Sequence, residues 1–150
     1  MSAFLRRTRL QGSTLNGKGH LSTLEGSPEI ARIAEETMKS LQLNNTSVVT
    51  GPFQKTLKGV LKSSKPVDFF FDDGHHDHDA TIQYFHEAVP YLADEAVIIF
   101  DDISWSAGMK KAWAEIENDE RITASIDLKT IGIALMGNKP ASKENFRIPL

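Results

Sequence analysis

The sequence predicts an α/β domain built around a mostly parallel β-sheet. Short apolar or β-branched segments alternate four times with amphipathic segments of helical period, and two of the apolar segments are uninterrupted, as in strands buried on both faces. A length of 150 residues is enough for one such domain with its own core. Residues 1–19 show no clear period, so we expect an irregular N-terminal segment followed by a single domain over 20–150.

Local signals set the bounds of the first two strand–helix units. Residues 20–25 alternate loosely between apolar and polar and predict a short strand. Ser27 suits a helix N-cap and Pro28 suits the first helical position, so the apolar residues that follow at helical spacing predict a helix over 28–41. A β-branched strand over 46–50 comes next, and a second amphipathic helix follows it.

The second half of the chain contains the two uninterrupted apolar strands, 67–71 and 96–100. Asp77 or Asp79 can cap the helix after the first of them, and Ser106 can cap the helix after the second. Two final strands are predicted near 122–128 and 130–136. Their alternation and short connection favour an antiparallel pair at an edge of the sheet.

Composition limits the classes of partner and compartment. A net charge of −3 and 40% hydrophobic residues are ordinary for a globular chain, so neither indicates a nucleic-acid partner. Because there is no cysteine, disulfides and thiolate metal sites are excluded. No apolar run follows the basic N-terminal residues, and no segment has the length of a membrane span. We therefore expect a cytoplasmic protein with neither a membrane nor a nucleic acid as partner.

Three predicted strands end in acidic residues: Glu25, Asp72-Asp73 and Asp101-Asp102. In an open parallel sheet, ligands bind outside the carboxyl ends of the strands, where a carboxylate can accept hydrogen bonds from both ribose hydroxyls of a nucleotide. Aspartates from adjacent strands can also hold Mg²⁺ or Ca²⁺. The alternatives are that Glu25 interacts with a helix dipole and that the aspartates cap helices and face water.

The histidines that follow Asp73 suggest a zinc site, but the spacing does not fit one. His76 and His78 supply the H-x-H of the H-x-H-x-D-H pattern of binuclear zinc hydrolases, whereas the required Asp and His fall on Ala80 and Thr81. A metal-dependent hydrolase that uses Asp73, Asp101, Asp102 and His76 remains a weaker alternative.

Three longer segments carry a resemblance to a known family. HLSTLEGSPEIARIAEE (20–36) resembles the second strand and helix of class I S-adenosylmethionine-dependent methyltransferases. VDFFFDDGHHDHDATIQYFHEAVPYL (67–92) resembles their fourth strand and helix, whose common form runs D-x-x-F-I-D-G-x-H. VIIFDDISWSAGMKKAWAEI (97–116) resembles the fifth strand and helix in a bacterial subgroup that methylates small molecules, and IDLKTIGIALM (126–136) fits the last antiparallel pair.

This resemblance implies a Rossmann-like fold with helices on both faces of the sheet and S-adenosylmethionine as cofactor. Glu25 would hold the ribose hydroxyls, and Gly26 would allow close approach of the cofactor. Gly51 and Phe53 would lie beside the adenine, and Asp73 would lie where the methyl donor meets the substrate.

The implied reaction is O-methylation of a small molecule, in some relatives with help from a divalent metal. Asp73, Asp101 and Asp102 match the positions that bind Mg²⁺ in the metal-dependent O-methyltransferases of this fold, where the cation lowers the pKa of the substrate hydroxyl. His76 would then be a general base or a fourth metal ligand. The predicted catalytic residues are His76 and Asp101.

The family's first strand and Gly-rich loop should precede His20, and residues 1–19 do not match them, so the domain is expected to be N-terminally truncated. Two inner strand edges would then lack a partner, at a cost of roughly 1–3 kcal/mol for each buried unsatisfied backbone group. We expect residues 3–10 to fill the slot, the neighbouring strands to close up, or a second chain to cover the edge in a homo-oligomer. The alternative function is a truncated, non-catalytic methyltransferase-fold protein that self-associates.

Overall fold

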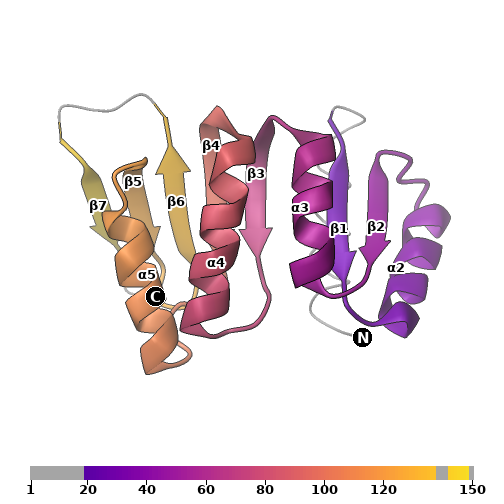
Figure 1. The fold of residues 1–150 in the computed structure, drawn as a ribbon, viewed down its shortest axis with the longest axis horizontal. Coiled ribbons are helices and arrows are strands. Elements are labelled where there is room, and N and C mark those ends of the chain that lie inside the picture. The colour runs from indigo at the N-terminus through magenta and orange to yellow at the C-terminus, as the bar shows by residue number, and fades with distance from the viewer. Residues whose placement is uncertain (1–18, 138–141, 149–150) are drawn as a thin grey trace. The chain divides into compact units, whose positions relative to one another are not determined.

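The computed structural model describes residues 19–137 and 142–148, which divide between two compact units, 1–63 and 64–150 (Figure 1). Within the described residues, no helix is both long and apolar enough to cross a membrane. The segment 1–18 lies outside the described part of the chain, so the predicted domain boundary after residue 19 stays a prediction.

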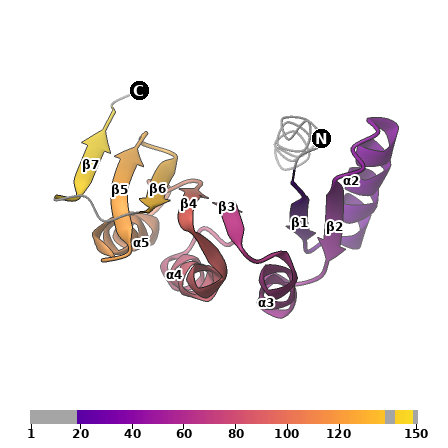
Figure 2. The ribbon, with the colours of Figure 1, turned by 90° about the horizontal axis from the view of Figure 1, so that it is seen from above.

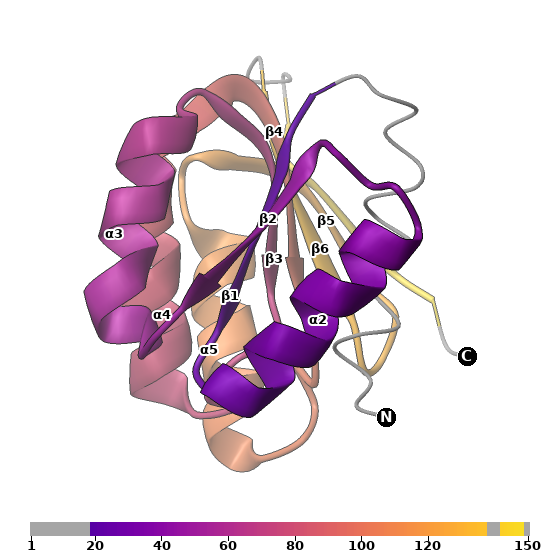
Figure 3. The ribbon, with the colours of Figure 1, turned by 90° about the vertical axis from the view of Figure 1, so that its right-hand side faces the viewer.

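The first unit is a small parallel sheet between two helices. Its elements are β1 (Leu21–Glu25), α2 (Pro28–Ser40), β2 (Thr46–Thr50) and α3 (Phe53–Ser64). The two helices lie on opposite sides of the β1–β2 pair (Figure 3). Ser27 caps α2 as predicted, because its hydroxyl oxygen accepts a hydrogen bond from the N–H of Ile30, and Pro28 is the first helical residue.

The second unit is a five-stranded sheet with two helices on one face (Figure 2). Its elements are β3 (Val67–Asp72), α4 (His78–Ala88), the 3-10 turn η1 (Val89–Tyr91), β4 (Leu92–Phe100), α5 (Ala107–Asn118), β5 (Ile122–Asp127), β6 (Gly132–Met136) and β7 (Glu144–Arg147). The strand order is β3-β4-β6-β5-β7. β3 runs parallel to β4, β6 is antiparallel to both β4 and β5, and β7 is parallel to β5.

Two strand predictions need correction. The last two predicted strands do pair antiparallel, but they do not form an edge, because β6 inserts between β4 and β5 and β7 adds a further strand beyond β5. β3 is not buried on both faces: Asp68 is exposed and Phe69 is 38% exposed. Among the described strands β3 pairs only with β4, so its other edge lacks a neighbouring strand that would cover it.

The three expected outcomes for the missing first strand all stay predictions, and within each unit the described strands pair as follows. β1 pairs only with β2, and β3 pairs only with β4. Whether residues 3–10 or a second chain supplies the missing pairing stays a prediction, since residues 3–10 lie outside the described part of the chain.

The core of the second unit is an aromatic cluster that requires a glycine opposite it. The rings of Phe85, Phe100 and Trp113 pack with centroids 6.2 Å apart in each successive pair. A Cβ atom built on Gly132 of β6 would lie 2.6–2.9 Å from the indole ring of Trp113. This strand can therefore carry no side chain at Gly132 unless the core is rearranged.

We expect Gly132→Ala to destabilise the protein by about 1–3 kcal/mol, because the added methyl group overpacks a core that is already filled. Urea unfolding followed by tryptophan fluorescence measures the change. Gly59→Ala is the matched control: its Cβ would meet nothing within 4 Å, and alanine favours the interior of α3 by about 1 kcal/mol. Equal stability of the two alanine variants would contradict the packing argument.

Candidate active site

In the first unit, the ends of β1 and β2 bring four predicted cofactor residues to one edge of the sheet. Glu25 is in register with Thr50, and the N–H of Gly51 donates to the carbonyl oxygen of Glu25 at 2.9 Å. Gly51 has a φ of 142°, a conformation that favours glycine. Phe53 begins α3 directly after this turn and is half-buried.

The Glu25 side chain is oriented by the chain that follows it. Its Oε1 atom accepts a hydrogen bond from the N–H of Ser27 at 2.9 Å, and no other hydrogen bond from the described residues reaches this carboxylate. A Cβ on Gly26 would meet nothing within 4 Å, so space is open beside the carboxylate. This geometry suits a ligand with hydroxyl groups, and the cofactor role of these residues stays a prediction.

In the second unit, the ends of β3 and β4 bring the predicted metal and catalytic residues to a common edge. The N–H of Asp101 donates to the carbonyl oxygen of Asp72 at 3.0 Å, which locks the two strand ends together. Asp73 therefore follows β3 beside the point where Asp101 and Asp102 follow β4. Asp101 is buried, with 7% of its surface exposed.

His76 and Asp102 face each other across this edge. The Nε2 atom of His76 lies 3.8 Å from Oδ2 of Asp102, and both side chains are half-buried. Asp102 has a left-handed φ of 54°, and its carbonyl oxygen accepts the N–H of Trp105 at 2.9 Å in the turn that follows. The predicted base thus has an acidic neighbour that can stabilise its protonated form.

Asp72 is a functional candidate that the sequence reasoning missed. Only 8% of its surface is exposed, its Oδ1 accepts the N–H of Gly74 at 3.2 Å, and its buried Oδ2 has no hydrogen-bond partner among the described residues. Burial raises the pKa of this carboxyl to about 7, the Gly74 hydrogen bond opposes that rise, and the charge of Asp73 adds to it. The signal was present in the sequence, because the family form D-x-x-F-I-D-G-x-H has an apolar Ile where this chain has Asp72.

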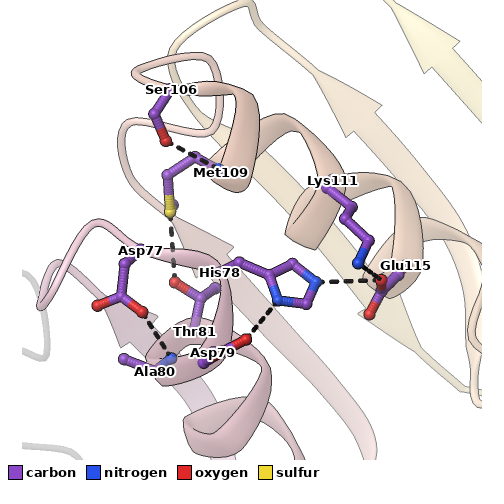
Figure 4. Close-up of polar contacts among 9 residues, drawn as sticks. All are labelled: Asp77, His78, Asp79, Ala80, Thr81, Ser106, Met109, Lys111 and Glu115. Atoms are coloured by element: carbon purple, nitrogen blue, oxygen red, sulfur yellow. Dashed lines mark hydrogen bonds and ion pairs between the residues drawn. The ribbon is translucent and has the colours of Figure 1, made fainter.

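The loops that carry these residues lead into two capped helices (Figure 4). Asp77 caps α4, as predicted, by accepting the N–H of Ala80 at 3.0 Å. Ser106 caps α5, as predicted, by accepting the N–H of Met109 at 3.1 Å. The buried hydroxyl of Thr81 on α4 donates to the sulfur of Met109 at 3.4 Å, so the first turns of the two helices are in direct contact.

His78 reinforces this contact between α4 and α5. Its Nδ1 lies 2.8 Å from Asp79 and its Nε2 lies 3.0 Å from Glu115 (Figure 4). These two carboxylates raise the pKa of His78, and His78 in turn lowers the pKa of Glu115. Lys111 also lies 3.6 Å from Glu115. The helix contact thus holds the two site loops, 73–77 and 101–106, at a defined spacing.

The metal prediction is not fulfilled by side chains already in place. Within 19–137 and 142–148, no group of three or more His, Asp or Glu side chains is arranged to hold a metal ion. The donor set of Asp73, Asp101 and Asp102 consists of hard oxygen atoms of the kind that Mg²⁺ prefers. The three metal ligands therefore stay a prediction that requires a direct binding measurement.

A Rossmann-like α/β fold with carboxylates at the carboxyl ends of its strands is typical of the class of proteins that bind nucleotide-type ligands there. Within that class, a family model described as a methyltransferase domain matches residues 2–103, so the chain belongs to this family. The resemblance to class I S-adenosylmethionine-dependent methyltransferases is thereby confirmed.

Solved structures with the same fold confirm the Rossmann-like architecture. An O-methyltransferase from Bacillus cereus in complex with SAH is 24% identical, with a TM-score of 0.67 over 79% of this chain and 63% of that one. The O-methyltransferase TomG from Streptomyces achromogenes, in complex with SAM, is 17% identical, with a TM-score of 0.70 over 85% of this chain and 66% of that one. MycE, a methyltransferase of mycinamycin biosynthesis in complex with Mg, SAH and mycinamycin VI, is 12% identical, with a TM-score of 0.60 over 91% of this chain and 50% of that one.

This chain therefore spans between half and two thirds of the length of these three enzymes. A search of proteins with curated functions found no significant match to the sequence.

Proposed function

We propose that the chain is the cofactor-binding part of an S-adenosylmethionine-dependent O-methyltransferase that acts on a small molecule. The observation that carries this proposal is the carboxylate of Glu25, oriented by the N–H of Ser27 at the carboxyl end of β1 in a methyltransferase-family domain. A carboxylate at this point of a Rossmann-like fold accepts hydrogen bonds from both ribose hydroxyls. The open space at Gly26 leaves room for the ribose to approach the backbone.

The second unit supplies groups for the methyl acceptor. Bound S-adenosylmethionine supplies a methyl group on a sulfonium, which an acceptor oxygen takes as the carbon–sulfur bond breaks and the sulfur keeps the electron pair. His76 accepts the proton that the acceptor hydroxyl loses, and Asp102, 3.8 Å away, stabilises the imidazolium that forms. The buried carboxylate of Asp101 is the second predicted catalytic group.

Trp105 supports an acceptor with a flat apolar part. Its side chain is 74% exposed, although an indole ring of this size is ordinarily mostly buried. Trp105 belongs to the loop between β4 and α5. Its backbone N–H donates a hydrogen bond to the carbonyl oxygen of Asp102. A planar acceptor could stack on this ring with its hydroxyl directed at the carboxylate edge.

Divalent-metal assistance is a separate part of the proposal. The carboxylates of Asp73, Asp101 and Asp102 follow adjacent strands, and their oxygen atoms suit Mg²⁺. The structure of MycE contains Mg, which supports the idea in a protein of similar fold. Calorimetric titration of Mg²⁺ into the protein, with and without S-adenosylmethionine, tests it apart from methyl transfer.

Self-association is proposed on the strand edges. Among the described strands, β1 and β3 each pair on one side only, and an open edge is a site at which a second chain can add. Light scattering at several protein concentrations measures the mass. A monomer at every concentration would contradict this part of the proposal.

Isothermal titration with S-adenosylmethionine tests the main proposal. We expect saturable binding, followed by transfer of a labelled methyl group to at least one member of a panel of phenols and other hydroxyl compounds. No binding at roughly millimolar cofactor, which corresponds to about −4 kcal/mol, would overturn the proposal for this chain. Combined with self-association, that result would favour the non-catalytic alternative.

A further inference from the structure

A buried tyrosine reaches from α4 to the loop that follows β3. Tyr84 is 1% exposed, and its hydroxyl oxygen lies 3.0 Å from Nδ1 of His75. The two rings meet edge to face, with centroids 6.0 Å apart. Burial, and then the charge of Asp72, raise the pKa of Tyr84, so its hydroxyl keeps its proton and is able to donate a hydrogen bond to the ring of His75.

The residue that Tyr84 holds has a strained backbone. His75 has a φ of 42°, a left-handed conformation that is unfavourable for a non-glycine residue and persists only where its surroundings enforce it. Three contacts enforce it here. The Asp72 carboxylate accepts the N–H of Gly74, the Tyr84 hydroxyl bonds the His75 ring, and the N–H of Asp77 donates to the His75 carbonyl oxygen.

Of these three contacts, the one from Tyr84 is the only one made to a side chain inside the turn, the His75 ring. The others fix the backbone on either side of it, at the end of β3 and at the N-cap of α4. The turn presents Asp73 before the strained residue and His76 after it, and His76 lies 3.8 Å from Asp102. A change in the orientation of His75 would therefore move His76 relative to Asp102.

We propose that Tyr84 is a positioning residue, whose hydroxyl holds His75 and thereby sets the direction in which the loop presents His76 to the acceptor. This inference rests on the proposed function, because it assigns His76 the task of removing the acceptor proton. Tyr84 itself is 1% exposed, so we assign it no direct contact with acceptor or cofactor.

Tyr84→Phe tests the proposal, because it keeps the ring and removes only the hydroxyl. We expect the methyl-transfer kcat to fall about tenfold, while the Kd for S-adenosylmethionine stays unchanged, since a base displaced by a fraction of an ångström impairs the chemical step alone. Nitrogen-15 spectra of the histidine rings should show changed signals for both His75 and His76. Tyr91→Phe, at the protein's other tyrosine, is the matched control and should change none of these readouts.

The two kinds of measurement separate failure of this inference from failure of the proposed function. The ring spectra need neither acceptor nor cofactor. They therefore show whether the Tyr84 hydroxyl orients His75 and His76 even if the unsubstituted protein transfers no methyl group. A Tyr84→Phe protein in which the His76 signals are unchanged would overturn the inference. An active protein whose kcat is unaffected by Tyr84→Phe would overturn it equally.

Discussion

Asp72→Asn is expected to stabilise the protein by about 4 kcal/mol at about pH 8.5, and this gain should disappear as the pH approaches about 4. The carboxyl of Asp72 is buried, and its pKa is raised from 3.8 to about 7 because burial disfavours the charged form. The amide of asparagine has the shape of the protonated carboxyl and carries no charge. It can still accept the N–H of Gly74, so the variant isolates the cost of ionisation.

The direction of the pH dependence follows from the sign of the shift. A carboxyl group whose pKa is higher in the folded state binds its proton more tightly there, so ionisation destabilises the fold. For Asp72 the penalty is absent below the unfolded value of 3.8, grows between about pH 4 and pH 7, and is constant above that range. A shift of roughly three units at about 1.4 kcal/mol per unit gives the expected magnitude.

Thermal or urea unfolding at several pH values, with a chelator present to exclude divalent cations, measures this effect. Asp68→Asn is the matched control, because Asp68 lies on the same strand with its side chain exposed, and no stabilisation is expected there. A Asp72→Asn protein that is no more stable than the unsubstituted chain at high pH would show that the carboxyl finds a partner in solution. A gain that persists at about pH 4 would trace the effect to packing instead of charge.

The parts of the fold that depend on local chemistry could be predicted from the sequence. Ser27 with Pro28, Asp77 and Ser106 mark helix starts because a short polar side chain satisfies backbone N–H groups within three residues of itself. The strand that ends at Phe100 closes an apolar run that two aspartates follow, and the strand that ends at Glu25 alternates apolar and polar residues before a glycine turn. Signals of this kind need no knowledge of the rest of the chain.

Pairing between distant strands could not be predicted in the same way. β7 was missed because all four of its residues, Glu144–Arg147, are exposed and show no apolar alternation. It is held by pairing with β5 and by the hydrogen bond from Ser125 to Asn145 at 2.9 Å. The position of β6 between β4 and β5 likewise depends on which edge is free once the earlier strands have paired.

Some features of the candidate site could likewise be predicted from the sequence, whereas others depend on how distant segments pack. Carboxylates at strand ends are visible in the sequence because each comes within two residues of an apolar run, as Asp73 and Asp101 do. The link between Tyr84 and His75 is invisible, because it depends on which face of α4 turns toward the loop. Asp72 lies between these cases: its position at the end of a strand was predictable, whereas its burial and the lack of a partner for its Oδ2 among the described residues required the structure.

Glu25→Ala is expected to weaken binding of S-adenosylmethionine by about 30- to 150-fold, or about 2–3 kcal/mol, with little change in stability. A carboxylate that accepts two ribose hydroxyls makes charge-assisted hydrogen bonds of about 1.5–3 kcal/mol each, and water replaces part of that energy in the variant. From the part of the chain that the structure describes, the Glu25 side chain accepts one hydrogen bond, at the half-exposed turn of Ser27, so its removal should affect the fold only slightly. Isothermal titration measures the affinity, and unfolding in urea measures the stability.

The neighbouring acid Glu29 provides the control that separates a ligand contact from a general loss of negative charge. Its carboxylate accepts the Ser27 hydroxyl at 2.8 Å on the exposed first turn of α2, so Glu29→Ala should leave the affinity for the cofactor unchanged. The ligand can be varied as well: for 2′-deoxy-S-adenosylhomocysteine, which lacks one ribose hydroxyl, Glu25→Ala should cost markedly less than it does for S-adenosylhomocysteine. Equal losses for the two ligands would mean that Glu25 acts through the turn at Ser27 and not on the ribose. The edge of β1 would then shape the cofactor site without contacting the sugar.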